Sequence, residues 1–320
     1  MNKNKSVICL GIMVADVVGR PLRAVPDPGR LVLVEEMGLY TGGCAVNAAT
    51  ALSRLGLPVE VVGKVGDDPF GEFLINTLKK RGIGIKGVTR DRILGTSATM
   101  VMVDNDGERR FVHYIGANAN LTFDDIDTSL LGEAAILHVA GSLVMPGIDG
   151  VPTAELLKLA KQKGVITFLD TVWDDTGRWK ELLEPCLPEI DYFVPSLPEA
   201  QALTGYQDPH EVARSLLNFG VGTVGLKMGS EGALVMDQKG IQIHLSAYQV
   251  DVIDATGAGD AFAAGFIAGV WNGWPLEKTG QFANAVGALC VTGVGASGGV
   301  SSLEETLTFM ENSHFKSEGD

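Results

Sequence analysis

The sequence predicts an α/β fold in which a doubly wound, mainly parallel β-sheet is flanked by helices. Short β-branched runs alternate with longer helical patterns through most of the chain, for example at 59–66 and then at 68–82. This alternation is typical of successive βα units, which build a parallel sheet covered by helices. A chain of 320 residues, of which 46% are hydrophobic, can bury one large core. We therefore expect a single domain over residues 1–320, with one small appended piece.

The N-terminal apolar run superficially resembles a signal peptide, because basic residues precede it, but its composition favours a first β-strand. Asp16 interrupts the run, and no convincing cleavage site of small residues follows. No uncharged apolar stretch reaches the roughly 18 residues that a membrane-spanning helix requires. We therefore expect a cytoplasmic protein without a membrane segment.

The rhythm of strands and helices recurs in the second half of the chain. The expected strands cover 135–141, 165–170, 191–196 and 223–229, and the expected helices cover 153–164, 198–205 and 210–220. Several βα units in a row predict a layered α/β domain.

Two segments break this rhythm. Residues 17–41 contain three prolines, and residues 96–115 alternate between apolar and polar side chains around an Asn-Asp-Gly turn at 105–107. The second pattern predicts a β-hairpin, with which the first segment could pair. If both lie outside the main sheet, they form a small β-sheet lid that can cover a site.

Composition argues against several classes of partner. A formal net charge of −14 disfavours a broad surface for nucleic acid or acidic lipid, which bind through accumulated Lys and Arg. The four cysteines lie far apart and show no spacing typical of a zinc site or a disulfide framework. We interpret them as reduced residues of the core or of the site's surroundings: Cys9, Cys44, Cys186 and Cys290.

The most informative stretch is Asp254-Ala-Thr-Gly-Ala-Gly-Asp260, which is followed by small and apolar residues at helical spacing. We interpret it as a strand end, a glycine turn and then a helix. Backbone N–H groups of such a turn can approach an anion, and the helix N-terminus adds positive potential. Asp260 would act there as a base for phosphoryl transfer, or it would merely cap the helix; the stretch alone leaves both readings open.

A second glycine-rich segment, at 41–49, leads into another helical pattern. Gly42 and Gly43 let a ligand or a strand press against the helix start, and Asn47 offers both donor and acceptor groups to a polyhydroxy ligand. A packed crossing of helix and strand explains the same residues equally well.

Other nucleotide-binding motifs are missing or lack their context. G-x-G-x-x-G occurs three times, but never with a preceding strand, a following helix and a suitably spaced acidic residue. The Walker P-loop and the protein-kinase signatures are absent. A phosphate-binding site here would need another cradle, for which the turn at 257–259 is the candidate.

Taken together, G-G-x-x-x-N at 42–47 and D-x-T-G-A-G-D at 254–260 resemble the two signatures of the PfkB, or ribokinase-like, carbohydrate kinases. Weaker matches at 11–16, 116–121 and 282–296 extend the resemblance over nearly the whole chain. The resemblance implies ATP as donor, Mg²⁺ as bridging ion, and transfer of phosphate to a hydroxyl group of a sugar or nucleoside beneath a β lid.

Carried over position by position, the resemblance implies a role for each matching residue. Asp260 is the general base, and Gly257, Ala258 and Gly259 form an anion hole. The acceptor's hydroxyl groups would be held by Asp16, Gly42, Gly43 and Asn47. The nucleotide would lie against Lys227, Gly229, Thr256 and Asn284.

The resemblance also implies two cation sites. Glu199 would help to organise Mg²⁺ through water, although Ser196 stands where the family usually has Asn, which puts the details in doubt. Asp254, with carbonyl groups around Gly293 and Gly295, resembles a loop that binds a monovalent cation such as K⁺ in many members.

The acceptor is left open. Val14 and Cys44 stand where ribokinase usually has Asn and Lys, so ribose is not a safe assignment. A nucleoside kinase of the same superfamily and a non-catalytic, sugar-binding regulatory protein are alternatives. An acceptor that already carries a phosphate would need basic groups, for which Arg30, Arg109 and Arg110 are candidates, although a role as solvated lid residues explains them better. Members of this family often dimerise through their lids, so a homodimer is a further expectation.

Overall fold

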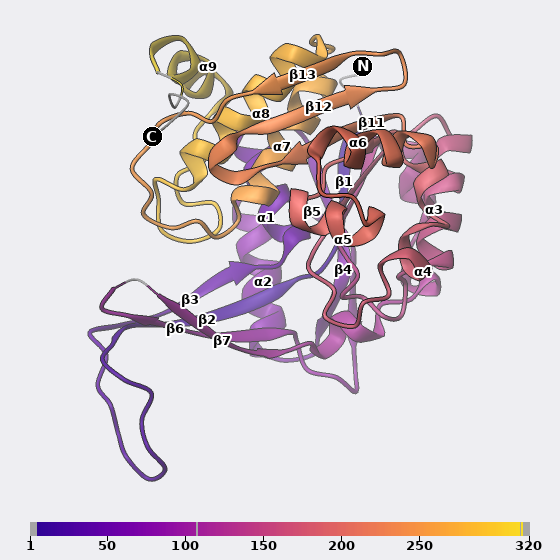
Figure 1. The fold of residues 1–320 in the computed structure, drawn as a ribbon. Coiled ribbons are helices and arrows are strands. Elements are labelled where there is room, and N and C mark those ends of the chain that lie inside the picture. The colour runs from indigo at the N-terminus through magenta and orange to yellow at the C-terminus, as the bar shows by residue number, and fades with distance from the viewer. Residues whose placement is uncertain (1–4, 107, 314, 316–320) are drawn as a thin grey trace.

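The computed structural model describes residues 5–106, 108–313 and 315, and its strands form two separate sheets (Figure 1). The larger is nine-stranded, with the spatial order β13-β12-β11-β10-β9-β8-β1-β4-β5. Neighbouring strands run parallel from β11 to β5, and β12 and β13 extend the sheet antiparallel at one edge. In spatial order the strands are Gln242–Leu245 (β13), Ala233–Asp237 (β12), Thr223–Lys227 (β11), Tyr192–Phe193 (β10), Ile166–Thr171 (β9), Ala134–Ser142 (β8), Ser6–Gly11 (β1), Val59–Gly66 (β4) and Gly84–Asp91 (β5). The predicted mainly parallel sheet is confirmed.

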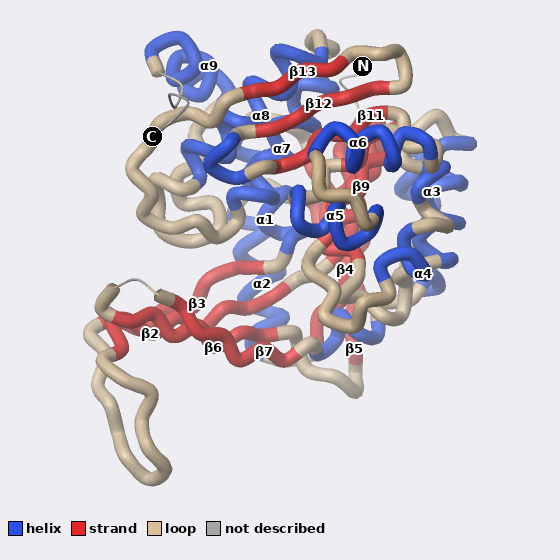
Figure 2. The backbone as a smooth tube through the Cα atoms, viewed as in Figure 1, coloured by secondary structure: helices blue, strands red, loops and turns tan. Residues whose placement is uncertain are grey.

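Helices cover both faces of this sheet, as a doubly wound fold requires (Figure 2). One face packs against α1 (Cys44–Arg54), α2 (Pro69–Lys80), α7 (Ala258–Trp271) and α8 (Leu276–Cys290), and α9 (Leu303–Asn312) packs on α8. The other face packs against α3 (Val151–Gln162), α4 (Trp179–Leu183), α5 (Leu197–Thr204) and α6 (Pro209–Asn218). Short 3-10 helices span Gly116–Asn120, Phe123–Asp125, Thr128–Glu133, Leu187–Glu189 and Gly229–Glu231. Within the described part of the chain, none of the helices has both the length and the apolarity to cross a membrane.

Strand β8 shows why the sheet forms where it does. All nine of its residues are buried, because β1 and β9 flank it and helices cover both of its faces. A strand in that position must be apolar on both sides, unlike the alternating strands of a half-exposed sheet. The two hydrophobic cores therefore lie on opposite sides of one continuous sheet.

The smaller sheet is the predicted lid, with the strand order β3-β2-β6-β7. Its strands span Glu36–Gly42 (β3), Val14–Leu22 (β2), Ala98–Asp104 (β6) and Arg109–Tyr114 (β7). The hairpin predicted within 96–115 is confirmed by the antiparallel pairing of β6 with β7, although Gly107 at its turn lies outside the described residues. The other predicted segment forms strands only at its ends, since 23–35 is an extended loop (Figure 2).

The predicted strand before the glycine turn at 257 is wrong. Strand β13 ends at Leu245, and the chain from there to Gly257 contains only an isolated bridge, at Tyr248. The reason is topological, since β13 is the edge strand of the sheet and the chain must leave that edge to reach α7. Asp254 therefore lies in a loop.

Candidate active site

The carboxyl ends of the parallel strands bring two charged side chains into contact. Lys227 ends β11, and its Nζ lies 2.7 Å from both carboxylate oxygens of Asp170, near the end of β9. Burial alone would lower the pKa of Lys227, but the charges of Asp170 and Glu199 outweigh it and raise that pKa. The lysine, whose side chain is 13% exposed, is therefore a largely shielded cation at the edge of the sheet where open α/β folds bind ligands.

The predicted anion turn lies next to this ammonium group. Gly257 is in the left-handed region, with a φ of 77°, and a Cβ there would collide with the carbonyl oxygen of Ala296. A Cβ on Gly259 would lie 3.2 Å from Nζ of Lys227. Gly257, the N-cap of α7, has no side chain that could bond the N–H groups of the first turn, and of these the Ala258 N–H group donates to the Ala255 carbonyl at 3.4 Å. The helix N-terminus and the lysine therefore face a common space that suits an anion.

Asp260 lies in the first turn of α7, where its carboxylate accepts a hydrogen bond of 2.8 Å from Nδ2 of Asn47 in α1. Burial raises the pKa of Asp260, an effect that the Asn47 hydrogen bond and the charge of Lys227 reduce. The carboxylate is thus a stronger base than an ordinary aspartate, and it does not cap its own helix. Because α1 and α7 contact each other directly, two segments far apart in sequence build this centre together.

The two glycines before α1 allow a close approach of the chain at the base of the lid. A Cβ on Gly42 would collide with the Asp16 carboxylate, and one on Gly43 would collide with the carbonyl oxygen of Ile12. Burial raises the pKa of Asp16, partly offset by Thr99 and by His113. The lid carboxylate of Asp16 therefore lies against the glycine pair that precedes α1, and its role in holding an acceptor stays a prediction.

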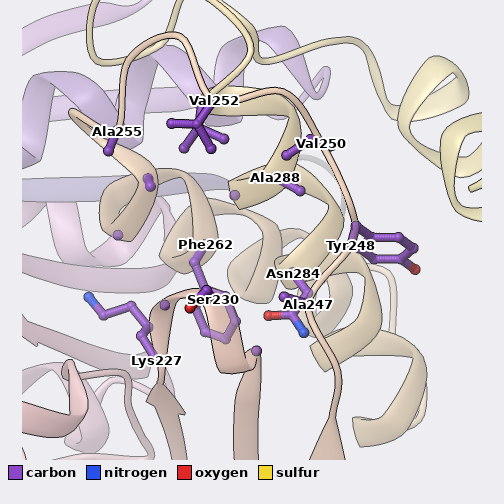
Figure 3. A pocket seen from close by; sticks show the side chains of 16 residues that line it. Lys227, Ser230, Ala247, Tyr248, Val250, Val252, Ala255, Phe262, Asn284 and Ala288 are labelled. Atoms are coloured by element: carbon purple, nitrogen blue, oxygen red, sulfur yellow. The ribbon is translucent and has the colours of Figure 1, made fainter. Parts of the chain in front are cut away.

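A cavity of about 350 Å³ opens beside the anion turn (Figure 3). Lys227 lies at one side of it, and apolar side chains including Val252 and Phe262 form its walls. The predicted nucleotide residues Gly229 and Asn284 line it, whereas Thr256 does not. Asn284 donates at 3.3 Å to the carbonyl groups of Leu245 and Ser246, which fixes its amide in the wall. The apolar walls and the adjacent anion turn suit an apolar group linked to phosphates.

Comparison with known proteins identifies the family. The sequence profile described as "pfkB family carbohydrate kinase" matches residues 4–303. The chain belongs to the PfkB family of carbohydrate kinases. It is 30% identical to "Probable fructokinase-5" of Arabidopsis thaliana over 85% of this chain and 89% of that protein.

Solved structures agree with this PfkB membership. A putative ribokinase II of E. coli in complex with ATP and Mg²⁺ has a TM-score of 0.85 and 26% identity, over 96% of this chain and 99% of that one. A ribokinase of Arabidopsis thaliana complexed with ribose and ATP has a TM-score of 0.83 and 25% identity, over 96% and 99%. The fold is therefore that of ribokinase.

Mg²⁺, which the PfkB family implies, would find few protein ligands here. The Glu199 carboxylate accepts hydrogen bonds from Ser196 N at 2.8 Å and from Thr171 Oγ1 at 3.0 Å, both on Oε2, and Ser196 caps α5 in return. No group of three His, Cys, Asp or Glu side chains in the described residues is arranged to hold a metal. This donor set fits Mg²⁺ held mainly by phosphates and water, with Glu199 in an outer position.

The predicted monovalent-cation loop is engaged by protein groups instead. Asp254 accepts hydrogen bonds from the backbone N–H groups of Thr256 at 2.8 Å and Gly295 at 2.9 Å, and it forms an ion pair with Arg109 of the lid. Gly293 lies at the start of the same loop, packed against the backbone of Gly298 and Gly299. Both oxygens of this carboxylate thus already have partners in the protein.

Sequence reasoning missed Asp170 and the contact between Arg109 and Asp254. Asp170 is the last residue of the segment predicted as a strand at 165–170, and ligands gather at the carboxyl ends of parallel strands, so its position was a usable signal. The partner of Arg109 had no comparable signal, because it depends on where the lid lies. The four cysteines are free, as expected.

Proposed function

We propose that this protein transfers the γ-phosphoryl group of ATP to a hydroxyl group of a sugar or sugar derivative. The observation that carries the proposal is the position of Asp260 in the first turn of α7, directly after Ala258 and Gly259, which line the cavity, and hydrogen-bonded to Asn47 of α1. The family membership and the ATP and Mg²⁺ complex of the E. coli relative support ATP as donor. Bound Mg-ATP would supply the phosphoryl group, and its Mg²⁺ would offset the negative charge of the phosphates.

The protein's own groups would perform three tasks in this reaction. Asp260 removes the proton from the attacking hydroxyl group, and its raised pKa suits that task. The N–H groups of 257–259 and the ammonium group of Lys227 stabilise the negative charge on the transferred phosphate. The lid excludes water, which would otherwise compete as the acceptor.

The acceptor class rests on the groups that surround Asp260. Asp16, Asn47 and the backbone at Gly42–Gly43 offer hydrogen-bonding partners of the kind that sugar hydroxyl groups require. Val14 is 4% exposed and Cys44 begins α1, so an apolar residue and a thiol replace the polar groups of ribokinase. We expect an acceptor other than ribose. The named fructokinase relative supports a sugar.

The experiment is a measurement of ADP release from Mg-ATP over a panel of pentoses, hexoses, keto-deoxy acids, phosphosugars and nucleosides. We expect release with one class of sugar, and Asp260→Asn should reduce kcat about a hundredfold or more. Asp260→Asn should not lower the melting temperature at pH 7.5. Burial raises the pKa of Asp260, so its ionised form destabilises the fold above that pKa, and the neutral amide avoids that cost.

Each other outcome assigns a different function. Turnover with adenosine or inosine, but with no sugar, would make the protein a nucleoside kinase. Sugar binding without ADP release from any acceptor would favour a regulatory binding protein. Full turnover by Asp260→Asn would exclude Asp260 as the base.

A further inference from the structure

Asp254 ties two loops of the proposed phosphate site together. Its Oδ1 accepts the N–H group of Thr256, directly before the anion turn, and its Oδ2 accepts the N–H group of Gly295, in the loop after α8. These hydrogen bonds lower the pKa of Asp254, against the effect of partial burial. The carboxylate is therefore a charged brace that fixes the position of the turn at 257–259.

Arg109 joins this brace to the lid. It is the first residue of β7, at the tip of the lid hairpin, and its guanidinium group pairs with Oδ1 of Asp254. The side chains are 22% and 12% exposed, so most of the contact is shielded from solvent. Arg110 points to the opposite face of the sheet, since successive strand residues alternate, and it pairs with Asp104 at 3.3 Å while 53% exposed. The chain thus contains two neighbouring arginines, of which one reaches the site and one does not.

A second arginine holds the other side of the same loop. Arg54, at the end of α1, donates through Nη1 to the carbonyl groups of Ser297, Gly298 and Val300. A monovalent cation in this loop would need carboxylate and carbonyl oxygens as ligands. Of the oxygens that the resemblance assigns to the cation, the Asp254 carboxylate is bound by Arg109 and by two backbone N–H groups, and the Gly295 carbonyl accepts the N–H group of Gly298 at 3.1 Å. The residues present do not fit the K⁺ site that the family resemblance implies.

We propose that Arg109 is a positioning residue that takes the place of a monovalent cation beside Asp254. Through this ion pair the lid holds the anion turn in position, and turnover does not require K⁺. When the lid lies over the site, the arginine fixes Asp254, and Asp254 fixes the N–H groups of the turn. The ion pair also neutralises Arg109, which removes it from the basic groups that could bind the phosphate of a phosphosugar. The proposal rests on the proposed kinase function.

The kinetic test compares the wild type with Arg109→Ala and with the matched control Arg110→Ala. ADP release is measured in N-methylglucamine buffer, with added K⁺, and with added guanidinium. We expect the kcat of the wild type to be the same with and without K⁺, and the kcat of Arg110→Ala to equal it under both conditions. Arg109→Ala should lose roughly tenfold or more in kcat, because misplacing catalytic groups is costly, and added guanidinium should restore part of the loss.

A second measurement does not depend on activity. Amide hydrogen exchange in Arg109→Ala should show faster exchange at 250–257 and 291–299 than in the wild type, whereas Arg110→Ala should show no change there. This result would support the brace even if the wild type released no ADP, an outcome that would instead refute the proposed kinase function.

Three results would overturn the inference. They are strong activation of the wild type by K⁺, an unchanged kcat in Arg109→Ala, and unchanged exchange at 250–257 in that variant. A rise in the KM of the acceptor alone, without a change in kcat or exchange, would instead place Arg109 in acceptor binding and would equally contradict the positioning role.

Discussion

The Asp260 carboxylate lies between groups that shift its pKa in opposite directions. Burial raises the pKa, while the hydrogen bond from Asn47 and the positive charge of Lys227 lower it. Asn47 is itself 8% exposed, so water cannot easily replace its amide. The proton affinity of the proposed base therefore depends on a residue that the glycine-rich segment at 41–49 contributes.

Replacing Asn47 with alanine should move the acid limb of the rate profile to higher pH. Loss of the hydrogen bond removes an interaction that favours the ionised form, so the pKa of Asp260 rises further. A base must be ionised to accept a proton. On acidification, the kcat of Asn47→Ala should therefore begin to fall at a higher pH than the kcat of the wild type. A hydrogen bond to a charged group corresponds to a shift of about 1 pH unit. The measurement is kcat as a function of pH.

Asn272→Ala is the matched control, because that amide also touches α7 but lies at the far end of the helix, where it donates to Ala268. Its acid limb should coincide with that of the wild type. If the limb of Asn47→Ala did not move either, Asn47 would not tune the base.

At the scale of single elements, β8 contains an unusual residue. His138 is 1% exposed, and neither ring nitrogen has a hydrogen-bond partner within the described structure. Its ring meets Phe168 edge to face, with centroids 6.5 Å apart. Burial, aided by the charge of Lys227, lowers the pKa of His138 to about 3. The histidine is therefore neutral in the folded protein at every pH at which the chain is expected to work.

This neutral histidine should make the fold sensitive to acid. The unfolded chain takes up a proton near pH 6.5, whereas the folded one does not until about pH 3, so stability is lost as pH falls below 6.5. The contribution is about 1.4 kcal/mol per pH unit. His138→Leu should remove that slope and should be no less stable at pH 7.5, because it buries no unpaired nitrogen.

Urea unfolding at pH 7.5 and 5.5 measures this difference. His244→Gln changes an exposed histidine of β13 and should keep the acid sensitivity of the wild type. Equal losses of stability in wild type and His138→Leu on acidification would show that the histidine is hydrated or paired in solution.

The elements could be predicted where local patterns determine them. The predicted strand at 59–66 coincides with β4, and the helix predicted within 68–82 is α2, which Asp68 caps by accepting the N–H group of Gly71. The loop before α7 was mistaken for a strand, because its β-branched residues carry no information about whether a partner strand is available. Local propensity cannot supply that information.

The site could be predicted in part for the same reason. Gly257 could be singled out from the sequence, since only glycine fits both its φ of 77° and the nearby carbonyl oxygen of Ala296. The pairs Lys227–Asp170 and Arg109–Asp254 join segments that meet only through the order of strands and the placement of the lid. Sequence spacing does not encode those distances.

At the scale of the whole molecule, the lid is a sheet with two different faces. The register pairs Asp16 with Thr99 and Thr99 with His113, so these side chains share the face that meets the site, together with Arg109. The opposite face carries Arg110 near the tip of the hairpin and is otherwise largely apolar and exposed over the described strands. Its apolar members are Met37 (70% exposed), Leu39 (39%), Met100 (54%), Val112 (59%) and Tyr114 (49%). A monomer rarely leaves such a face uncovered.

We therefore propose that two copies of the chain associate through these outer lid faces, which would also hold each lid in position over its site. Met100 lies near the middle of the face, on β6, so Met100→Glu should weaken the dimer most. Loss of a buried methionine from each copy corresponds to about 3 kcal/mol, or roughly a hundredfold in Kd. Sedimentation equilibrium of wild type and variant measures it, and Arg92→Glu, which changes an exposed residue outside this face, should leave the dimer intact. A wild type that is monomeric at micromolar concentration would leave the apolar face without this partner, and the lid would then have to be held by Arg109 and Asp254 alone.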